Sequence, residues 1–131
     1  MENKPLSLLE LNSLVRRSIT SCLPDEYWVQ AELSDVRVNY SGHCYLEFVQ
    51  KDATGNALLA KARGIIWANV FTRLRSYFER ETGQAFVSGL KVLVKVTVDF
   101  HELYGYSLTV VNIDPTYTSV SYTHLTLPTK L

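Results

Sequence analysis

The side chains of this sequence that are best suited to binding chemistry are cations and flat rings, which recur together in three short stretches. Lys and Arg can neutralise phosphates, and unstacked bases can lie on aromatic rings, each stack being worth on the order of 1–3 kcal/mol. Cations interleaved with rings therefore suit a single-stranded nucleic acid. The residues concerned, with one asparagine among them, are Arg37, Asn39, Tyr40, His43, Tyr45, Lys61, Arg63, His101 and Tyr104, with Trp67 and Tyr106 as weaker members.

Motifs for catalysis do not occur in the sequence. It contains no GxxxxGK(S/T), no GxGxxG and no GxSxG. His43, Cys44 and His101 come nearest to a metal-ligand set, but strand alternation turns Cys44 away from the histidines. The carboxylates have no spacing suited to magnesium. We therefore expect this chain to hold no catalytic residue, no metal and no cofactor.

The composition is that of one globular domain. The 131 residues are 47% hydrophobic and 20% charged, which is enough to form a core. Thirteen basic and thirteen acidic residues cancel, so the net charge neither favours nor excludes a polyanionic partner. Cys22 and Cys44 indicate neither a zinc site nor a disulfide framework. The chain shows no signal peptide and no membrane span, so we expect a cytoplasmic location and no membrane partner.

Two helices are predicted. Leucines and other apolar residues recur at helical spacing over Ser7–Cys22, and Ser7 with Glu10 forms a capping box. Arg16 in this helix is expected to face solvent. The second helix covers Asn69–Glu81, and Gly83 follows as its C-terminal stop.

Alternation of apolar and polar residues predicts the first two strands. The first begins at Tyr27, and unbroken alternation would turn Arg37 inward, so we expect a bulge near Ser34 that lets Arg37 emerge. Residues 39–42 have turn chemistry. In the second strand, residues 43–49, the inward positions are Cys44, Leu46 and Phe48, and the outward positions are His43, Tyr45, Glu47 and Val49.

Three further strands follow. Residues 57–66 form the third, with Leu58, Ala60 and Gly64 among its inward positions, as fits a strongly curved sheet. Residues 91–100 and 107–114 form the fourth and fifth, and Pro115 is expected to end the last.

The order of elements predicts a mainly β fold. Five antiparallel strands with a helix between the third and fourth are typical of the OB-fold, a Greek-key barrel, here preceded by an N-terminal helix. A half-open sandwich is the structural alternative. OB-folds bind on the face of strands two and three, between the loops joining strands one to two and four to five. The residues selected above fall on that face and those loops, with Arg37, Lys61 and Arg63 placed to meet phosphates and Tyr40, Tyr45 and Tyr104 placed to stack.

Four segments resemble the N-terminal OB domain of the exodeoxyribonuclease VII large subunit. They are WVQAELSDVR, SGHCYLEFVQKD, ARGIIW and GLKVLVKVTVDFHELYGYSLTVVNIDP, within Leu6–Asp114. The resemblance implies a subunit of an enzyme that cuts single-stranded DNA, with this domain gripping DNA and a later domain performing hydrolysis. It places Ser41, Gly42, His43 and Tyr45 at the binding surface. It implies single-stranded DNA as the partner, and a small subunit that docks through regions absent here.

The chain therefore divides into an N-terminal helix (1–26), an OB-fold domain (27–118) and a tail (119–131) read as non-native or disordered. Two alternatives stay open: an OB module that binds protein or oligosaccharide, and a complete small hydrolase. Taken singly, each ring also fits an ordinary strand whose outer face it covers.

Overall fold

A computed structural model of the protein describes residues 4–120, and its elements follow the predicted order. Neither helix in that range is long and apolar enough to cross a membrane. The elements are α1 (Leu8–Cys22), β1 (Glu26–Val38), β2 (Cys44–Lys51), β3 (Leu58–Ile66), α2 (Ala68–Thr82), β4 (Leu90–His101) and β5 (Gly105–Val120).

The five strands close into a barrel in the order β1-β2-β3-β5-β4. All neighbouring pairs are antiparallel except β3 and β5, which pair in parallel through Gly64 with Leu108 and Ile65 with Thr109. This strand order and the position of α2 between β3 and β4 confirm the predicted OB-fold. The half-open sandwich is excluded, because the barrel is closed.

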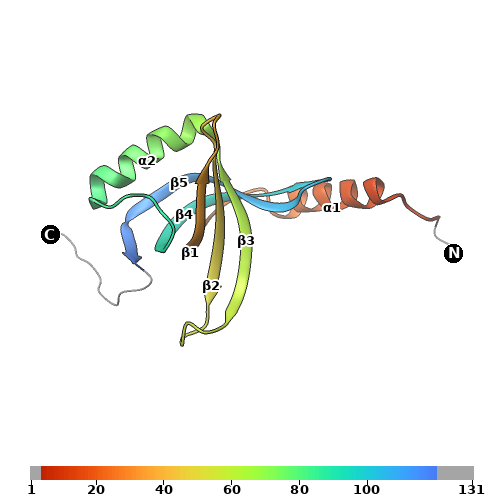
Figure 1. The fold of residues 1–131 in the computed structure, drawn as a ribbon. Coiled ribbons are helices and arrows are strands. Elements are labelled where there is room, and N and C mark those ends of the chain that lie inside the picture. The colour runs from red at the N-terminus through yellow and green to blue at the C-terminus, as the bar shows by residue number, and fades with distance from the viewer. Residues whose placement is uncertain (1–3, 121–131) are drawn as a thin grey trace.

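The core lies inside the barrel and under α2, which covers one end of it (Figure 1). Phe48 of β2 and Val94 of β4 are buried as alternation predicts. Phe71 and Phe78 on the apolar face of α2 pack against Phe86. The centroid of the Phe86 ring lies 6.1 Å from that of Phe71 and 5.4 Å from that of Phe78. Gly83 ends α2 in the left-handed conformation that favours glycine.

The predicted bulge in β1 is confirmed. The pairing of β1 with β2 shifts register between Leu33 and Asp35. Leu33 is fully buried and the Arg37 side chain is well exposed, because the extra residue reverses which face the strand presents to the core.

Three side chains on β2 and β3 differ from the prediction in their burial. Val49 was placed outward but is only 4% exposed, because the long side chains of its cross-strand neighbours Glu32 and Lys61 stand beside it on the same face. Leu58 and Ala60 were placed inward but are exposed, Leu58 at 56%. The β2–β3 hairpin projects beyond the barrel, where no other helix or strand of residues 4–120 covers it (Figure 1).

The end of β5 also differs from the prediction. Pro115 does not end the strand, which continues to Val120 and pairs again with β4 through Ser119 opposite Lys91. A register shift between Lys91 and Leu93 accommodates the extra residues. At this bend Asp114 Oδ1 accepts hydrogen bonds from the backbone N–H and the hydroxyl of Thr116. Ser119 and Val120 of the predicted tail thus belong to β5, and 121–131 lie outside the described residues.

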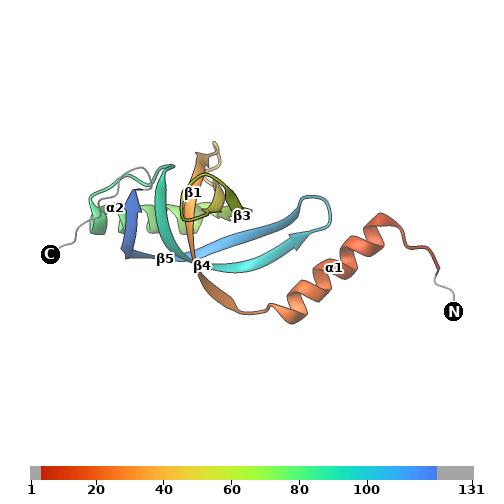
Figure 2. The same ribbon diagram turned by 90° about the horizontal axis from the view of Figure 1, so that it is seen from below.

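Helix α1 lies beside the β4–β5 hairpin, and both extend away from the barrel (Figure 2). The predicted capping box is present, with Ser7 Oγ accepting from the Glu10 amide and Glu10 Oε1 accepting from the Ser7 amide. Arg16 was predicted to face solvent, but it forms an ion pair with Glu102 in the hairpin loop.

Candidate nucleic-acid interface

A groove of about 1020 Å³ lies between the outer face of β2 and β3 and the β4–β5 hairpin. Its floor and walls combine aromatic rings, cations and hydroxyls. Five of the predicted binding residues line it, together with Trp67, and these are Arg37, Tyr45, Arg63, His101 and Tyr104. Tyr106, which was expected to be the weakest candidate, is half-exposed and does not line this groove.

The β1–β2 turn lies beside the groove and does not line it. Asn39 Oδ1 accepts hydrogen bonds from the amides of Ser41 and His43, each 3.0 Å long. Gly42 adopts a φ of +91°, which favours glycine. The ring of Tyr40 is fully exposed at the tip. Asn39, Ser41 and Gly42 therefore shape the turn, and Tyr40 is its accessible ring.

His43 joins β2 to α2. Its Nδ1 accepts a 3.0 Å hydrogen bond from the Ala68 amide at the start of α2, where the N-cap residue Trp67 provides no side-chain acceptor. The His43 ring also packs edge-on against Trp67, with centroids 5.0 Å apart. His43 is thus half-buried and holds in place a tryptophan that lines the groove.

Arg63 fastens the β4–β5 loop. Its guanidinium donates hydrogen bonds to the carbonyl oxygens of Tyr104 and Tyr106. His101 Nδ1 accepts from the amides of Leu103 and Tyr104, at 3.0 and 3.4 Å. The rings of His101 and Tyr104 are 4.8 Å apart at an interplanar angle of 30°. The loop thus presents two neighbouring rings, tilted relative to one another, to the groove.

Carboxylates partly neutralise the cations at this surface. Arg37 Nε lies 2.9 Å from Asp35 Oδ2, and Lys61 Nζ, which does not line the groove, lies 3.6 Å from Glu47 Oε2. Asp99 also lines the groove and accepts hydrogen bonds from the hydroxyls of Thr97 and Thr109. Asp99 was not among the predicted binding residues, although the alternation of apolar and polar residues along β4 turns it outward.

Glu102 connects α1 to the hairpin loop. Its carboxylate accepts hydrogen bonds from Arg16 Nε at 2.6 Å and Ser13 Oγ at 3.1 Å, and its carbonyl accepts from Asn12 Nδ2 at 2.9 Å. The hydrogen bond from Arg16 is the main cause that lowers the pKa of Glu102. No spacing in the sequence signals this contact, because the partners are almost 90 residues apart.

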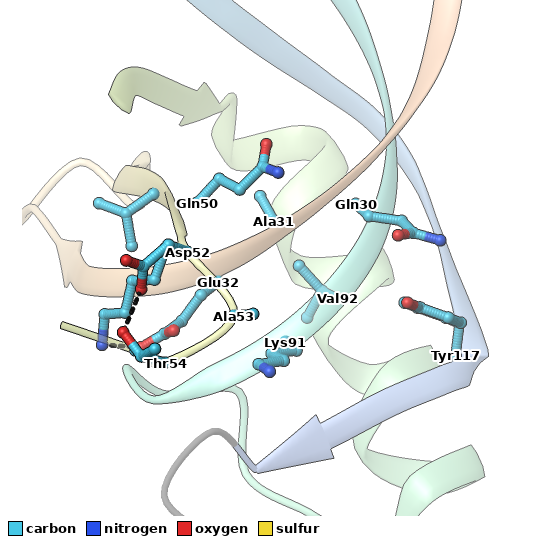
Figure 3. Close-up of a pocket in the computed structure, with 13 residues that line it drawn as sticks. Gln30, Ala31, Glu32, Gln50, Asp52, Ala53, Thr54, Lys91, Val92 and Tyr117 are labelled. Atoms are coloured by element: carbon cyan, nitrogen blue, oxygen red, sulfur yellow. Dashed lines mark hydrogen bonds and ion pairs between the residues drawn. The ribbon is translucent and has the colours of Figure 1, made fainter. Parts of the chain in front are cut away.

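A second, polar hollow of about 540 Å³ lies between β1, β4, the end of β5 and the β2–β3 turn (Figure 3). Gln30 and Tyr117 lie at one side of it, and Asp52 and Thr54 lie at the other. The Thr54 hydroxyl, followed by backbone amides of the same turn, lowers the pKa of Asp52. No motif or spacing in the sequence predicts this hollow.

Cys44 points into the core as predicted. Burial raises the pKa of its thiol to about 11, and the nearby charge of Arg75 lowers that pKa by a smaller amount. The thiol therefore stays protonated at neutral pH. Within residues 4–120 no three His, Cys, Asp or Glu side chains gather as a metal site.

The sequence matches a family described as "OB-fold nucleic acid binding domain" over residues 6–114. The chain belongs to this family. The exodeoxyribonuclease 7 large subunit of Deinococcus radiodurans is 38% identical to it over 117 residues, which cover 86% of this chain. The chain spans 28% of that relative's length.

The groove of this OB-fold nucleic acid binding domain occupies the position at which the fold binds its ligands, on the β2–β3 face between the two loops. The structure brings together residues from β1, β2, β3 and the β4–β5 loop there. Asn39, Tyr40, Ser41, Gly42, His43 and Lys61 surround the groove without lining it.

Proposed function

We propose that the chain binds single-stranded DNA in the β2–β3 groove, as the OB domain of an exodeoxyribonuclease VII large subunit. The observation that carries the proposal is the groove itself, in which Tyr45, Trp67 and the paired rings of His101 and Tyr104 face a common space beside Arg37. Rings that face a common space accept bases that are not paired with another strand.

The preference for a single strand follows from the same rings. A duplex keeps its bases stacked on one another, so it cannot place a base on Tyr45 or Tyr104. A single strand can do so and can lay its phosphates near Arg37. The similarity to an exodeoxyribonuclease 7 large subunit supports DNA as the nucleic acid.

The parent protein would hydrolyse the DNA that this domain holds, through a part outside this chain. In that arrangement the chain alone needs no cofactor, and a small subunit docks on other regions of a cytoplasmic enzyme. The purified chain should therefore leave single-stranded DNA intact, with or without magnesium.

The proposal is tested by fluorescence anisotropy with a labelled oligothymidylate of about 16 nucleotides, the upper end of OB-fold site sizes. A duplex of equal length, measured at the same two salt concentrations, is the comparison. We expect the single strand to bind more tightly and its affinity to fall as salt rises.

A variant on α2, at a residue that lines neither hollow, serves as the control. Tyr77 is an exposed ring on α2 that lines neither hollow, so Tyr77→Ala should bind as the parent chain does. Equal affinity for duplex and single strand, or binding only to an oligosaccharide, would contradict the proposal and favour another OB-type binding module.

A further inference from the structure

One face of β4 connects the two hollows of the molecule. Alternation places Lys91, Lys95, Thr97 and Asp99 on the outer side of this strand. Thr97 and Asp99 line the β2–β3 groove, whereas Lys91 lines the polar hollow. The extended chain from Lys91 to Thr97 covers about 20 Å. The outer side of β4 therefore runs from the groove to Lys91 at the polar hollow, which Ala31 and Val92 from the inner side of β1 and β4 also line.

Trp28 lies on that surface between the hollows. It pairs with Lys95 across the β1–β4 ladder, so both side chains project from the same side of the sheet. The Trp28 side chain is 48% exposed, and Lys95 Nζ lies 5.8 Å from its ring centroid. Lys95 is two residues from Thr97, which lines the groove. The exposed ring of Trp28, opposite Lys95, therefore lies close to the end of the groove.

The polar hollow continues the same series of side chains. Gln30 of β1 lies two residues beyond Trp28, and Figure 3 shows it near Tyr117 of β5. Tyr117 is a half-exposed ring, and Lys91 lies on the same wall. Amides can donate to and accept from base edges, and the ring offers a second stacking surface.

The charges of this surface nearly balance. Glu26 lies 3.3 Å from Lys95, and Glu32 lies 3.2 Å from Lys51. Attraction of phosphates alone would therefore give little affinity here. Stacking on Trp28 and Tyr117 would have to carry the interaction, which favours a strand with free bases over a duplex or a free phosphate.

We propose that single-stranded DNA leaving the β2–β3 groove continues along the outer face of β4, stacks on Trp28 and ends in the polar hollow beside Lys91 and Tyr117. This second contact track rests on the proposed function, since it extends the path of the same ligand. We assign this ligand as the occupant because the outer side of β4 runs from the groove to the polar hollow.

The two tryptophans of the chain allow a direct test, because Trp67 lines the groove and Trp28 lies on the track. Trp28→Phe leaves Trp67 as the single fluorophore, and Trp67→Phe leaves Trp28. Each variant is titrated to one equivalent with oligothymidylates of about 5 and about 16 nucleotides, which bracket OB-fold site sizes. We expect the short strand to quench Trp67 alone and the long strand to quench both.

The possible outcomes separate the two proposals. If the long strand quenches Trp67 but leaves Trp28 unchanged, the track is wrong and the groove stands. If neither tryptophan responds to either strand, the proposed function fails and the track fails with it.

An affinity measurement gives a second readout. Trp28→Ala should weaken binding of the long strand roughly 5- to 150-fold, the loss of one stacked base, and leave the short strand unaffected. Tyr77→Ala, the matched loss of an exposed ring elsewhere, should change neither. Equal weakening of both strands by Trp28→Ala, in a variant with parental circular dichroism, would overturn the track.

Discussion

Arg63 binds the protein's own loop as well as lining the groove. Its guanidinium donates to the carbonyls of Tyr104 and Tyr106, so these donors already have partners before any phosphate arrives. Arg37 differs, because its exposed side chain pairs with the carboxylate of Asp35, two positions earlier in the same strand. Both arginines were predicted to contact phosphates. Arg63 instead holds the β4–β5 loop in place, whereas Arg37 is the more accessible cation.

The two arginines should respond differently to removal. Arg37→Ala should reduce the salt dependence of single-strand binding by about 0.7 in slope, the value for one phosphate contact. Arg63→Ala should weaken binding and also accelerate amide hydrogen exchange in the loop 102–106. Loop exchange that stays at the parental rate in Arg63→Ala would show that Arg63 does not fasten the loop.

Tyr45 provides a ring on the floor of the groove, and its side chain is 40% exposed. Tyr45→Ala should cost on the order of 1–3 kcal/mol of binding free energy, with an unchanged salt slope, because a stacking surface and no charge is lost. Tyr45→Phe keeps the ring and should bind almost as the parent does. Anisotropy titrations check both, and a Phe variant as weak as Ala would argue against stacking.

At the scale of elements, α1 supports the β4–β5 hairpin where it projects from the barrel (Figure 2). Within the described residues α1 buries no side chain completely, so its polar contacts to Glu102 are important for its position. The carboxylate of Glu102 must be charged to keep its ion pair with Arg16. This gives the docking of α1 a dependence on pH.

The sign of that dependence follows from the lowered pKa of Glu102. The contribution of this ion pair to stability is complete above the ordinary pKa of a glutamate, and it is lost as the pH falls through the lower pKa that Glu102 has in the folded protein. Thermal unfolding of the parent and of Glu102→Gln between pH 7 and pH 3 should therefore differ at neutral pH and converge in acid. A constant difference across that range would contradict the role given to the Glu102 charge.

The packing of β3 against β2 depends on Gly64. A Cβ at this position would overlap the ring of Phe48, which is almost fully buried. Gly64→Ala should destabilise the fold by about 1–3 kcal/mol. Adding Phe48→Leu should recover part of that loss, because the smaller side chain makes room. Urea unfolding of the two single variants and the double variant measures the coupling, and strictly additive losses would show that the two residues do not clash.

For the whole molecule, local patterns predicted most of the barrel. Alternation identified all five strands, and the conflict at Asp35 and Arg37 located the bulge. Errors arose where the surroundings differ from an ideal two-faced sheet. Val49 is shielded by neighbouring strands, and Leu58 lies on a hairpin beyond the core. Pro115 bends β5 without ending it, because the pairing partner β4 absorbs the extra residues.

The sequence predicted five of the residues that line the groove, but not the contacts that hold them in place. The OB topology placed Tyr45, Arg63 and His101 around one groove, as expected from their strands and loop. The bond from the Ala68 amide to His43 depends on how the chain closes in space. The contacts between α1 and Glu102 and the lining of the polar hollow also depend on how the folded chain brings distant residues together. The spacing of residues in the sequence therefore does not reveal them.

The most direct test of DNA binding in the β2–β3 groove is a two-dimensional amide NMR titration with an oligothymidylate. We predict that the largest shifts fall on β2, β3 and the β4–β5 loop, at residues such as Tyr45, Arg63 and Tyr104. The exposed face of α2 around Tyr77 should stay unchanged. Shifts centred on α2, or an unperturbed groove at a saturating concentration of the strand, would contradict this account.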